Sequence, residues 1–224
     1  MSAAPIVRMQ KVSKSFGPPD DETPVLHDVE LTILPGEKVS LIGPSGCGKS
    51  TLLALIAGLL RPDSGTVEID GVAMSDLDER ARARLRAERI GIALQSDNLI
   101  PFLSARENVE LALAFGAPRS RRAVRTRALE LLELLGVASR ANHQPRRLSG
   151  GEAQRVALAV SMANRPGLLL ADEVVAQLDG ETAAHVVDEV LAADFAVLYV
   201  THDVTLADLV ERRYSIDGFG VHPR

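Results

Sequence analysis

Short apolar segments, partly β-branched, recur along the chain and are typical of buried parallel strands. The clearest are KVSLIG (38–43), GLLLAD (167–172) and FAVLYVTHD (195–203). Segments with helical periodicity alternate with them, and one of these, AVRTRALELLELLG, ends at Gly136 as helices often do. This alternation predicts an α/β fold with a parallel sheet, whose ligands lie beyond the carboxyl ends of the strands.

Two further segments, VELTILPG and GTVEIDG, alternate apolar and polar residues and close with tight turns, which predicts a small antiparallel β-subdomain. Between about residues 96 and 165 the periodicity is helical only. Two of these helices begin with a capping box, formed by Ser104 with Glu107 and by Ser149 with Glu152. We expect one domain over residues 1–224, with a core of 1–95 and 166–224 and an inserted α-helical subdomain at about 96–165.

The composition of the 224 residues, 46% of them hydrophobic, suits a globular unit with a packed interior. No apolar run approaches the ~18 residues that cross a bilayer, and the first residues lack a signal-peptide core. The single cysteine, Cys47, fits a reducing compartment, and we expect a cytosolic protein. A net charge of -5 and only 3% aromatic residues argue against nucleic-acid binding.

Arginines gather in two short stretches, ERARARLRAERI (79–90) and PRSRRAVRTR (118–127), in spite of the negative total charge. The simpler interpretation is a solvated helix face with acidic residues nearby. The alternative is a surface close to phospholipid head groups or to an acidic loop of a partner.

The stretch GPSGCGKS (43–50) fits the pattern G-x-x-x-x-G-K-[ST] and lies between an apolar strand and a helix, the context that the pattern requires. Backbone amides at the glycines can wrap phosphate oxygens, Lys49 can bridge the terminal phosphates, and Ser50 can ligate Mg²⁺. Roughly one chain in a hundred of this length matches by chance. We predict a nucleoside triphosphate site formed by Gly43, Pro44, Ser45, Gly46, Cys47, Gly48, Lys49, Ser50 and Thr51.

An apolar strand that ends in two acids, LLLADE (168–173), supplies the groups that the phosphate loop lacks. Asp172 is suited to the metal ion, and Glu173 to orienting or deprotonating a water molecule. Apolar strands ending in acids are common, so this segment alone is consistent with an ordinary strand end. Together with the phosphate loop it predicts the hydrolytic half of an ATPase site.

The stretch LSGGEAQRV (148–156) places Gly150 and Gly151 at the first positions of a helix. A capping box explains Ser149 and Glu152, but helix formation gives no reason for glycines, which destabilise helices. Exposed amides at a helix N-terminus attract phosphate. A second phosphate-binding element about a hundred residues after the first suggests a composite site shared between two copies of the chain.

With these motifs in this order, the chain resembles the ATP-binding-cassette family over nearly its whole length. The resemblance implies that Phe16 stacks on adenine, Glu173 is the catalytic base and His202 contacts the γ-phosphate. It also implies that Gln95 reaches the metal ion and couples to a membrane partner, and that Asp179 belongs to the nucleotide-binding set. The implied metal ligands are Ser50, Gln95 and Asp172, and the implied contacts with ATP of the other subunit are Ser149, Gly150 and Gly151.

Within the family, the stretches at 26–71 and 82–113 are similar to the branch that serves lipoprotein-releasing and macrolide-export systems. The resemblance implies an ATPase that uses ATP and Mg²⁺, lies peripherally on the cytoplasmic side of the inner membrane, and forms a homodimer or cassette pair with ATP at the interface. Its partner would be an integral membrane permease that exports or extracts lipoproteins, peptides or drugs. The alternative, as in the related cell-division cassette, is mechanical control of an extracytoplasmic enzyme without transport.

Two departures from the family pattern bear on the rate of hydrolysis. Leu94 stands before Gln95 where the family usually has phenylalanine, and Val174, Val175 and Ala176 stand where it has Pro-Thr-Ser. We expect slow basal hydrolysis that rises when the membrane partner orders the loop. We also expect an effect on communication between the subunits and a smaller effect on nucleotide binding.

Two other classes of protein fit the motifs less well. A chromosome or repair ATPase would need a coiled-coil insertion, zinc ligands or a basic DNA-binding face. A small-molecule phosphotransferase would leave LSGGE unexplained. The chain also ends soon after His202, so we expect no appended regulatory domain.

Overall fold

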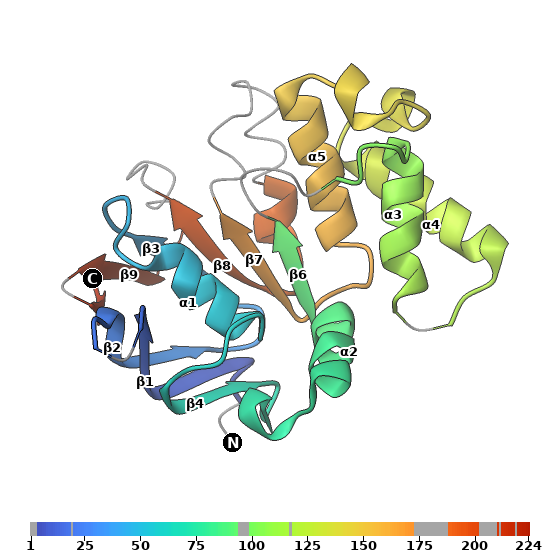
Figure 1. Ribbon diagram of the computed structural model, residues 1–224. Coiled ribbons are helices and arrows are strands. Elements are labelled where there is room, and N and C mark those ends of the chain that lie inside the picture. Colours follow the sequence, from blue (N-terminus) through green and yellow to red (C-terminus); the bar gives the residue numbers. More distant parts are fainter. Residues whose placement is uncertain are drawn as a thin grey trace. The chain divides into compact units, whose positions relative to one another are not determined.

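The computed structural model describes residues 4–18, 20–93, 99–116, 118–172, 188–201, 210, 212–217 and 219–224. The chain divides into two compact units. The first comprises Met1–Ala83 and Asp194–Arg224, and the second comprises Arg84–Ala193. Figure 1 shows the ribbon of both units. No helix among the described residues has the length and apolarity needed to cross a membrane.

The antiparallel sheet of the first unit has the strand order β2-β1-β4-β5. Its strands are β1 (Val7–Phe16), β2 (Thr23–Ile33), β4 (Ser64–Ile69) and β5 (Val72–Ala73). In β1, Val7 and Met9 are buried while Arg8 and Gln10 between them are exposed, so one face of the strand packs inward. The antiparallel β-subdomain predicted from the alternating pattern is thus present.

The parallel strands of the first unit follow the order β9-β3-β8. They are β3 (Lys38–Ile42), β8 (Ala196–Thr201) and β9 (Arg212–Asp217), and the short β10 (Gly220–Pro223) pairs with β9 in antiparallel direction. Every residue of β8 is buried, as a strand covered on both faces requires. Helix α1 (Lys49–Ile56) follows β3, and the turn η1 (Met74–Asp76) leads to α2 (Glu79–Arg89).

The second unit combines a pair of parallel strands with a helical segment. The strands are β6 (Ile90–Ala93) and β7 (Leu168–Asp172). The helices are α3 (Ala105–Ala114), α4 (Arg121–Leu134), η2 (Ala138–Arg140), η3 (Pro145–Arg147) and α5 (Gly150–Ser161). Among the described residues from 99 to 167 there is no strand, which agrees with the helical periodicity.

Helices α3, α4 and α5 pack together through apolar side chains that are fully buried, among them Val109, Leu131, Leu132 and Val156. Both predicted capping boxes are confirmed. Ser104 caps α3 with Glu107, and Ser149 caps α5 with Glu152. Each box satisfies backbone amides that a helix leaves without partners at its N-terminus.

Candidate functional site

Glycines at both ends of the loop between β3 and α1 allow a backbone path that other residues would hinder. Gly43 follows β3, and a Cβ atom there would lie 2.6 Å from Cγ2 of Ile216 on β9. Gly48, the N-cap of α1, has φ 101°, a left-handed conformation in which other residues are strained. A Cβ atom on Gly48 would also lie 3.0 Å from Val25. The two glycines are therefore required by space at one end of the loop and by backbone conformation at the other.

The Nζ atom of Lys49 donates to the carbonyl oxygens of Gly43, at 2.6 Å, and Pro44, at 2.7 Å. The ammonium therefore lies against the loop itself. Helix α1 has no side-chain cap and no acidic residue in its first turn. Its N-terminal amides and the positive end of its dipole remain available to an anion. This geometry is suited to phosphate groups.

The remaining residues of the loop differ in exposure. Pro44, Ser45, Gly46 and Ser50 are exposed, while Cys47 is half-buried. The Sγ atom of Cys47 lies 3.9 Å from Nζ of Lys49, on the same loop. Thr51, in the first turn of α1, is half-buried.

Phe16 ends β1, and its side chain keeps 43% of its surface exposed. Nζ of Lys14 lies 5.4 Å from the centroid of the Phe16 ring, in a cation–π contact. The same ammonium bonds to Oδ1 of Asp63 at 2.6 Å, and this hydrogen bond lowers the pKa of the Asp63 carboxyl. Lys14 was not predicted. The signal was available in the sequence, because Lys14 and Phe16 lie two residues apart on one strand and such residues face the same side.

Asp172 ends β7 in the second unit and is half-buried. Strand β7 is apolar and buried up to Ala171, so the first acid appears at the carboxyl end of a parallel strand, as the sequence pattern predicts. In α/β sheets this is the edge at which ligands bind.

The N-terminus of α5 carries the LSGGE motif. Oγ of Ser149 accepts from the backbone amide of Glu152 at 3.2 Å, and the Glu152 carboxylate accepts from the amide of Ser149 at 2.8 Å. Ser149 and Gly150 are exposed, and a Cβ atom on Gly150 would have no neighbour within 4 Å. Space does not require a glycine there, and the position is open to solvent.

The charge of Glu152 is favoured by its neighbours. The backbone hydrogen bond from Ser149 and then the side-chain hydrogen bond from Arg140 lower the pKa of the Glu152 carboxyl. Arg140 comes from η2 and reaches Oε1 of Glu152 at 2.7 Å. Arg140 was not predicted, because no sequence pattern connects it with Glu152.

Several predicted site residues lie outside the described residues. They are Gln95, Glu173, Asp179 and His202, and the departures Leu94, Val174, Val175 and Ala176 lie outside them too. The first unit holds Phe16 and the phosphate loop, and the second holds Asp172 and the LSGGE segment. The roles of all these residues remain predictions.

The family model described as ABC transporter matches residues 26–176, which contain the phosphate loop, the LSGGE segment and Asp172. The chain belongs to the ABC transporter family. It is an ATPase domain of that family, as the motifs predict. The α/β fold with its antiparallel and helical additions is the fold of ABC cassettes.

Relatives of known name cover nearly the whole chain. It is 43% identical over 212 residues to the lipoprotein-releasing system ATP-binding protein LolD 2 of Caulobacter vibrioides, covering 93% of this chain and 92% of that protein. It is 43% identical over 216 residues to the ABC transporter ATP-binding protein YbbA of Escherichia coli, with coverages of 95% and 94%. A solved dimeric ATP-binding cassette in a post-hydrolysis state, bound to ADP and phosphate, is 38% identical with a TM-score of 0.91, and the match covers 96% of both chains.

Proposed function

We propose that this ABC ATPase powers the extraction of lipoproteins, or export of a related kind, through an integral membrane permease. The observation that carries the proposal is the 43% identity to the LolD 2 protein over 93% of the chain. An ATPase of this kind lies peripherally on the cytoplasmic side of the inner membrane.

ATP binding in this proposal rests on the first unit. The exposed Phe16 ring stacks on adenine, and the phosphates lie on the loop that begins at Gly43. The Lys49 ammonium then breaks its hydrogen bonds to the loop carbonyls and donates to the terminal phosphates instead. The dipole of α1 adds to the binding of negative charge.

Mg²⁺ fits the donor set that the chain offers. Ser50 contributes an exposed hydroxyl at the start of α1, and Asp172 contributes a carboxylate at the end of β7. Hydroxyl and carboxylate oxygens are the ligands that Mg²⁺ prefers, and Gln95 is the third proposed ligand. When bound, the ion neutralises charge on the phosphates. Glu173 takes the proton from the attacking water, and His202 contacts the γ-phosphate.

Two copies of the chain, or one copy and a second cassette, close over ATP in this proposal. The support is the exposed N-terminus of α5, where Ser149, Gly150 and Gly151 present amides and a hydroxyl to an anion. The phosphate loop already serves one nucleotide. The LSGGE segment is therefore assigned to the nucleotide of the other subunit.

The test is to isolate the membrane protein that co-purifies with the chain and reconstitute both in proteoliposomes. We expect ATP hydrolysis to accelerate with the partner present and to release a lipoprotein from the membrane. If the partner instead activates an extracytoplasmic enzyme and no molecule is transported, the function is mechanical signalling and not extraction. Failure of any membrane protein to co-purify would contradict both roles.

A further inference from the structure

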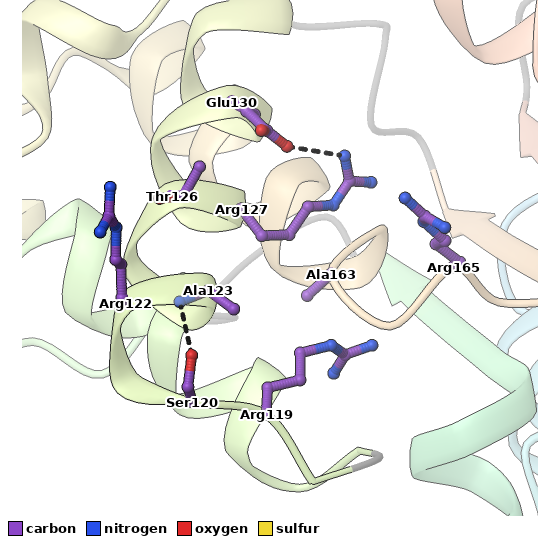
Figure 2. A pocket seen from close by; sticks show the side chains of 9 residues that line it. All are labelled: Arg119, Ser120, Arg122, Ala123, Thr126, Arg127, Glu130, Ala163 and Arg165. Atoms are coloured by element: carbon purple, nitrogen blue, oxygen red, sulfur yellow. Dashed lines mark hydrogen bonds and ion pairs between the residues drawn. The ribbon is translucent and has the colours of Figure 1, made fainter.

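A cavity of about 520 Å³ lies in the second unit, between the first turns of α4 and the segment that follows α5. Four arginines and a single glutamate supply the charged groups that line it: Arg119, Arg122, Arg127, Arg165 and Glu130. In Figure 2 the side chains of Arg119, Arg127 and Arg165 extend around Ala163, while Arg122 lies on the other side of α4. We call this cavity the arginine pocket.

Two uncharged oxygen atoms are among the acceptors that hold Arg119 in place. Its Nη1 atom donates to Oδ1 of Asn164 at 3.0 Å and to the carbonyl oxygen of Leu113 at 3.4 Å. Asn164 is itself fixed, because its Nδ2 atom donates to the carbonyl oxygens of Ala112, at 2.8 Å, and Ala87, at 3.3 Å. These two bonds turn the amide oxygen of Asn164 toward the arginine. The guanidinium is thus oriented in advance.

The positive charges of the pocket exceed the negative charge beside them. Glu130 pairs with Arg127 at 3.6 Å. Arg122 and Arg165 form no ion pair within the part of the chain that the structure describes. Arg165 also has φ 54°, a left-handed conformation that costs an L-residue about 1 kcal/mol. The backbone amide of Arg165 donates to the carbonyl oxygen of Met162, so this conformation belongs to the turn that follows α5.

This concentration of positive charge does not follow from the composition, since the chain has a net charge of -5. Guanidinium groups gathered around a concave surface repel one another and attract an anion. The first turn of α4 adds the positive end of a helix dipole and contains no acidic residue. Ser120 and Thr126 add hydroxyl groups to the lining.

We propose that the arginine pocket binds a phosphate ester. Guanidinium groups donate paired hydrogen bonds that match phosphate oxygens, and three of them surround one side of the pocket. The pocket is wide and opens to solvent, so a phosphate that carries a substituent can enter it. The ester is either a phospholipid head group or a soluble compound. The lining of the pocket carries this proposal, and none of its residues belongs to the proposed ATP site.

The experiment measures binding of inositol hexakisphosphate to the full-length chain by calorimetry. A saturating non-hydrolysable ATP analogue with Mg²⁺ fills the phosphate loop throughout. The test variant combines Arg119→Gln with Arg165→Gln. The matched control combines Arg121→Gln with Arg125→Gln, which removes the same charge from exposed positions of α4 that do not line the pocket. Arg165→Gln alone serves as a second test, because this exposed side chain has no ion pair among the described residues to lose.

We expect the test variant to weaken binding at least about tenfold, and the control to change it less than about twofold. Sedimentation with phosphatidylglycerol vesicles separates the two sources of the ester. A lipid head group would be assigned if the parent chain co-sediments with the vesicles, inositol hexakisphosphate releases it from them, and the test variant does not co-sediment. Soluble binding without vesicle binding would assign a soluble ester. Equal binding by test and control variants would overturn the proposal, and so would equally tight binding of poly-glutamate.

Discussion

Arg140 and Glu152 form an ion pair in which Nε lies 2.7 Å from Oε1, and the other carboxylate oxygen of Glu152 accepts from the amide of Ser149 at 2.8 Å. The Glu152 carboxylate therefore connects Ser149, the N-cap residue of α5, to Arg140 of η2. The N-terminus of α5 is held from outside the helix as well as by its own capping box.

Replacing Arg140 by alanine removes this outer support. We expect ATP turnover at saturating MgATP to fall roughly fivefold, because small displacements of a phosphate-binding element have large effects on rate. The melting temperature should change little, since a partly exposed ion pair contributes about 1 kcal/mol or less. Steady-state hydrolysis and thermal unfolding measure the two effects. Arg146→Ala, which removes a charge from the nearby η3, is the control, and equal turnover of both variants would show that Arg140 has no positioning role.

The lowered pKa of Glu152 predicts a pH dependence of stability. The carboxylate is stabilised by folding, so its contribution is complete above the ordinary pKa of glutamate and is lost as pH falls through the lower pKa of the folded state. Glu152→Gln keeps a capping side chain but cannot titrate. The free energy of unfolding, measured in urea from pH 6 down to about pH 3, should therefore fall less steeply in the variant. Parallel curves would mean that the capping carboxylate is not coupled to folding.

Replacing Glu173 by glutamine should abolish turnover and leave ATP binding intact, because the proposed base is lost while both phosphate-binding elements remain. The ATP-bound dimer should then accumulate. Light scattering with and without MgATP follows its formation, and nucleotide binding is measured separately. A variant that binds ATP but stays monomeric at saturation would contradict a composite site between two copies and would require a different cassette as partner.

The Val174, Val175 and Ala176 segment predicts slow basal hydrolysis, because it lacks the proline and hydroxyl groups found in the family. Combining Val174→Pro, Val175→Thr and Ala176→Ser should raise basal turnover at saturating MgATP by up to about a hundredfold. A displacement of catalytic groups by ~1 Å lowers the rate by about that factor. The affinity for ATP should stay the same. No gain in turnover would mean that another step limits the rate.

The phosphate loop, the capping boxes and the alternation of strands and helices could be predicted because their signals are local. Ser149 and Glu152 lie within one helical turn, and Gly43, Gly48 and Lys49 follow one continuous eight-residue pattern. The antiparallel strands were recognisable for the same reason, since alternation and turn residues lie in adjacent positions.

Contacts between distant segments could not be predicted in this way. In the sequence, a loop and the 3-10 helix η3 separate Arg140 from Glu152. Helices α4 and α5 separate Arg119 from Asn164, yet their side chains form a hydrogen bond. Which residues meet across such distances depends on helix packing, which a hydrophobic pattern does not specify.

The two arginine-rich stretches show the same limit. In the first, Arg84 is exposed and pairs with Glu88 at 2.8 Å, one turn along α2, as a solvated face predicts. Arg82 of the same stretch is buried instead and pairs with Glu79. In the second, Arg119 and Arg127 are joined by Arg165, which lies outside the stretch. The sequence could show that arginines gather there, but not that a third segment completes the cluster.

The left-handed backbone of Arg165 has a consequence for the evolution of the chain. Asparagine adopts this conformation more readily than arginine, so Arg165→Asn is a single substitution that should raise the melting temperature. Selection for stability alone would favour that exchange, and the same exchange removes a cation from the arginine pocket. If the arginine pocket binds a phosphate ester as proposed, stability and binding compete at position 165, and the residue found there in related chains should show which of the two each lineage has kept.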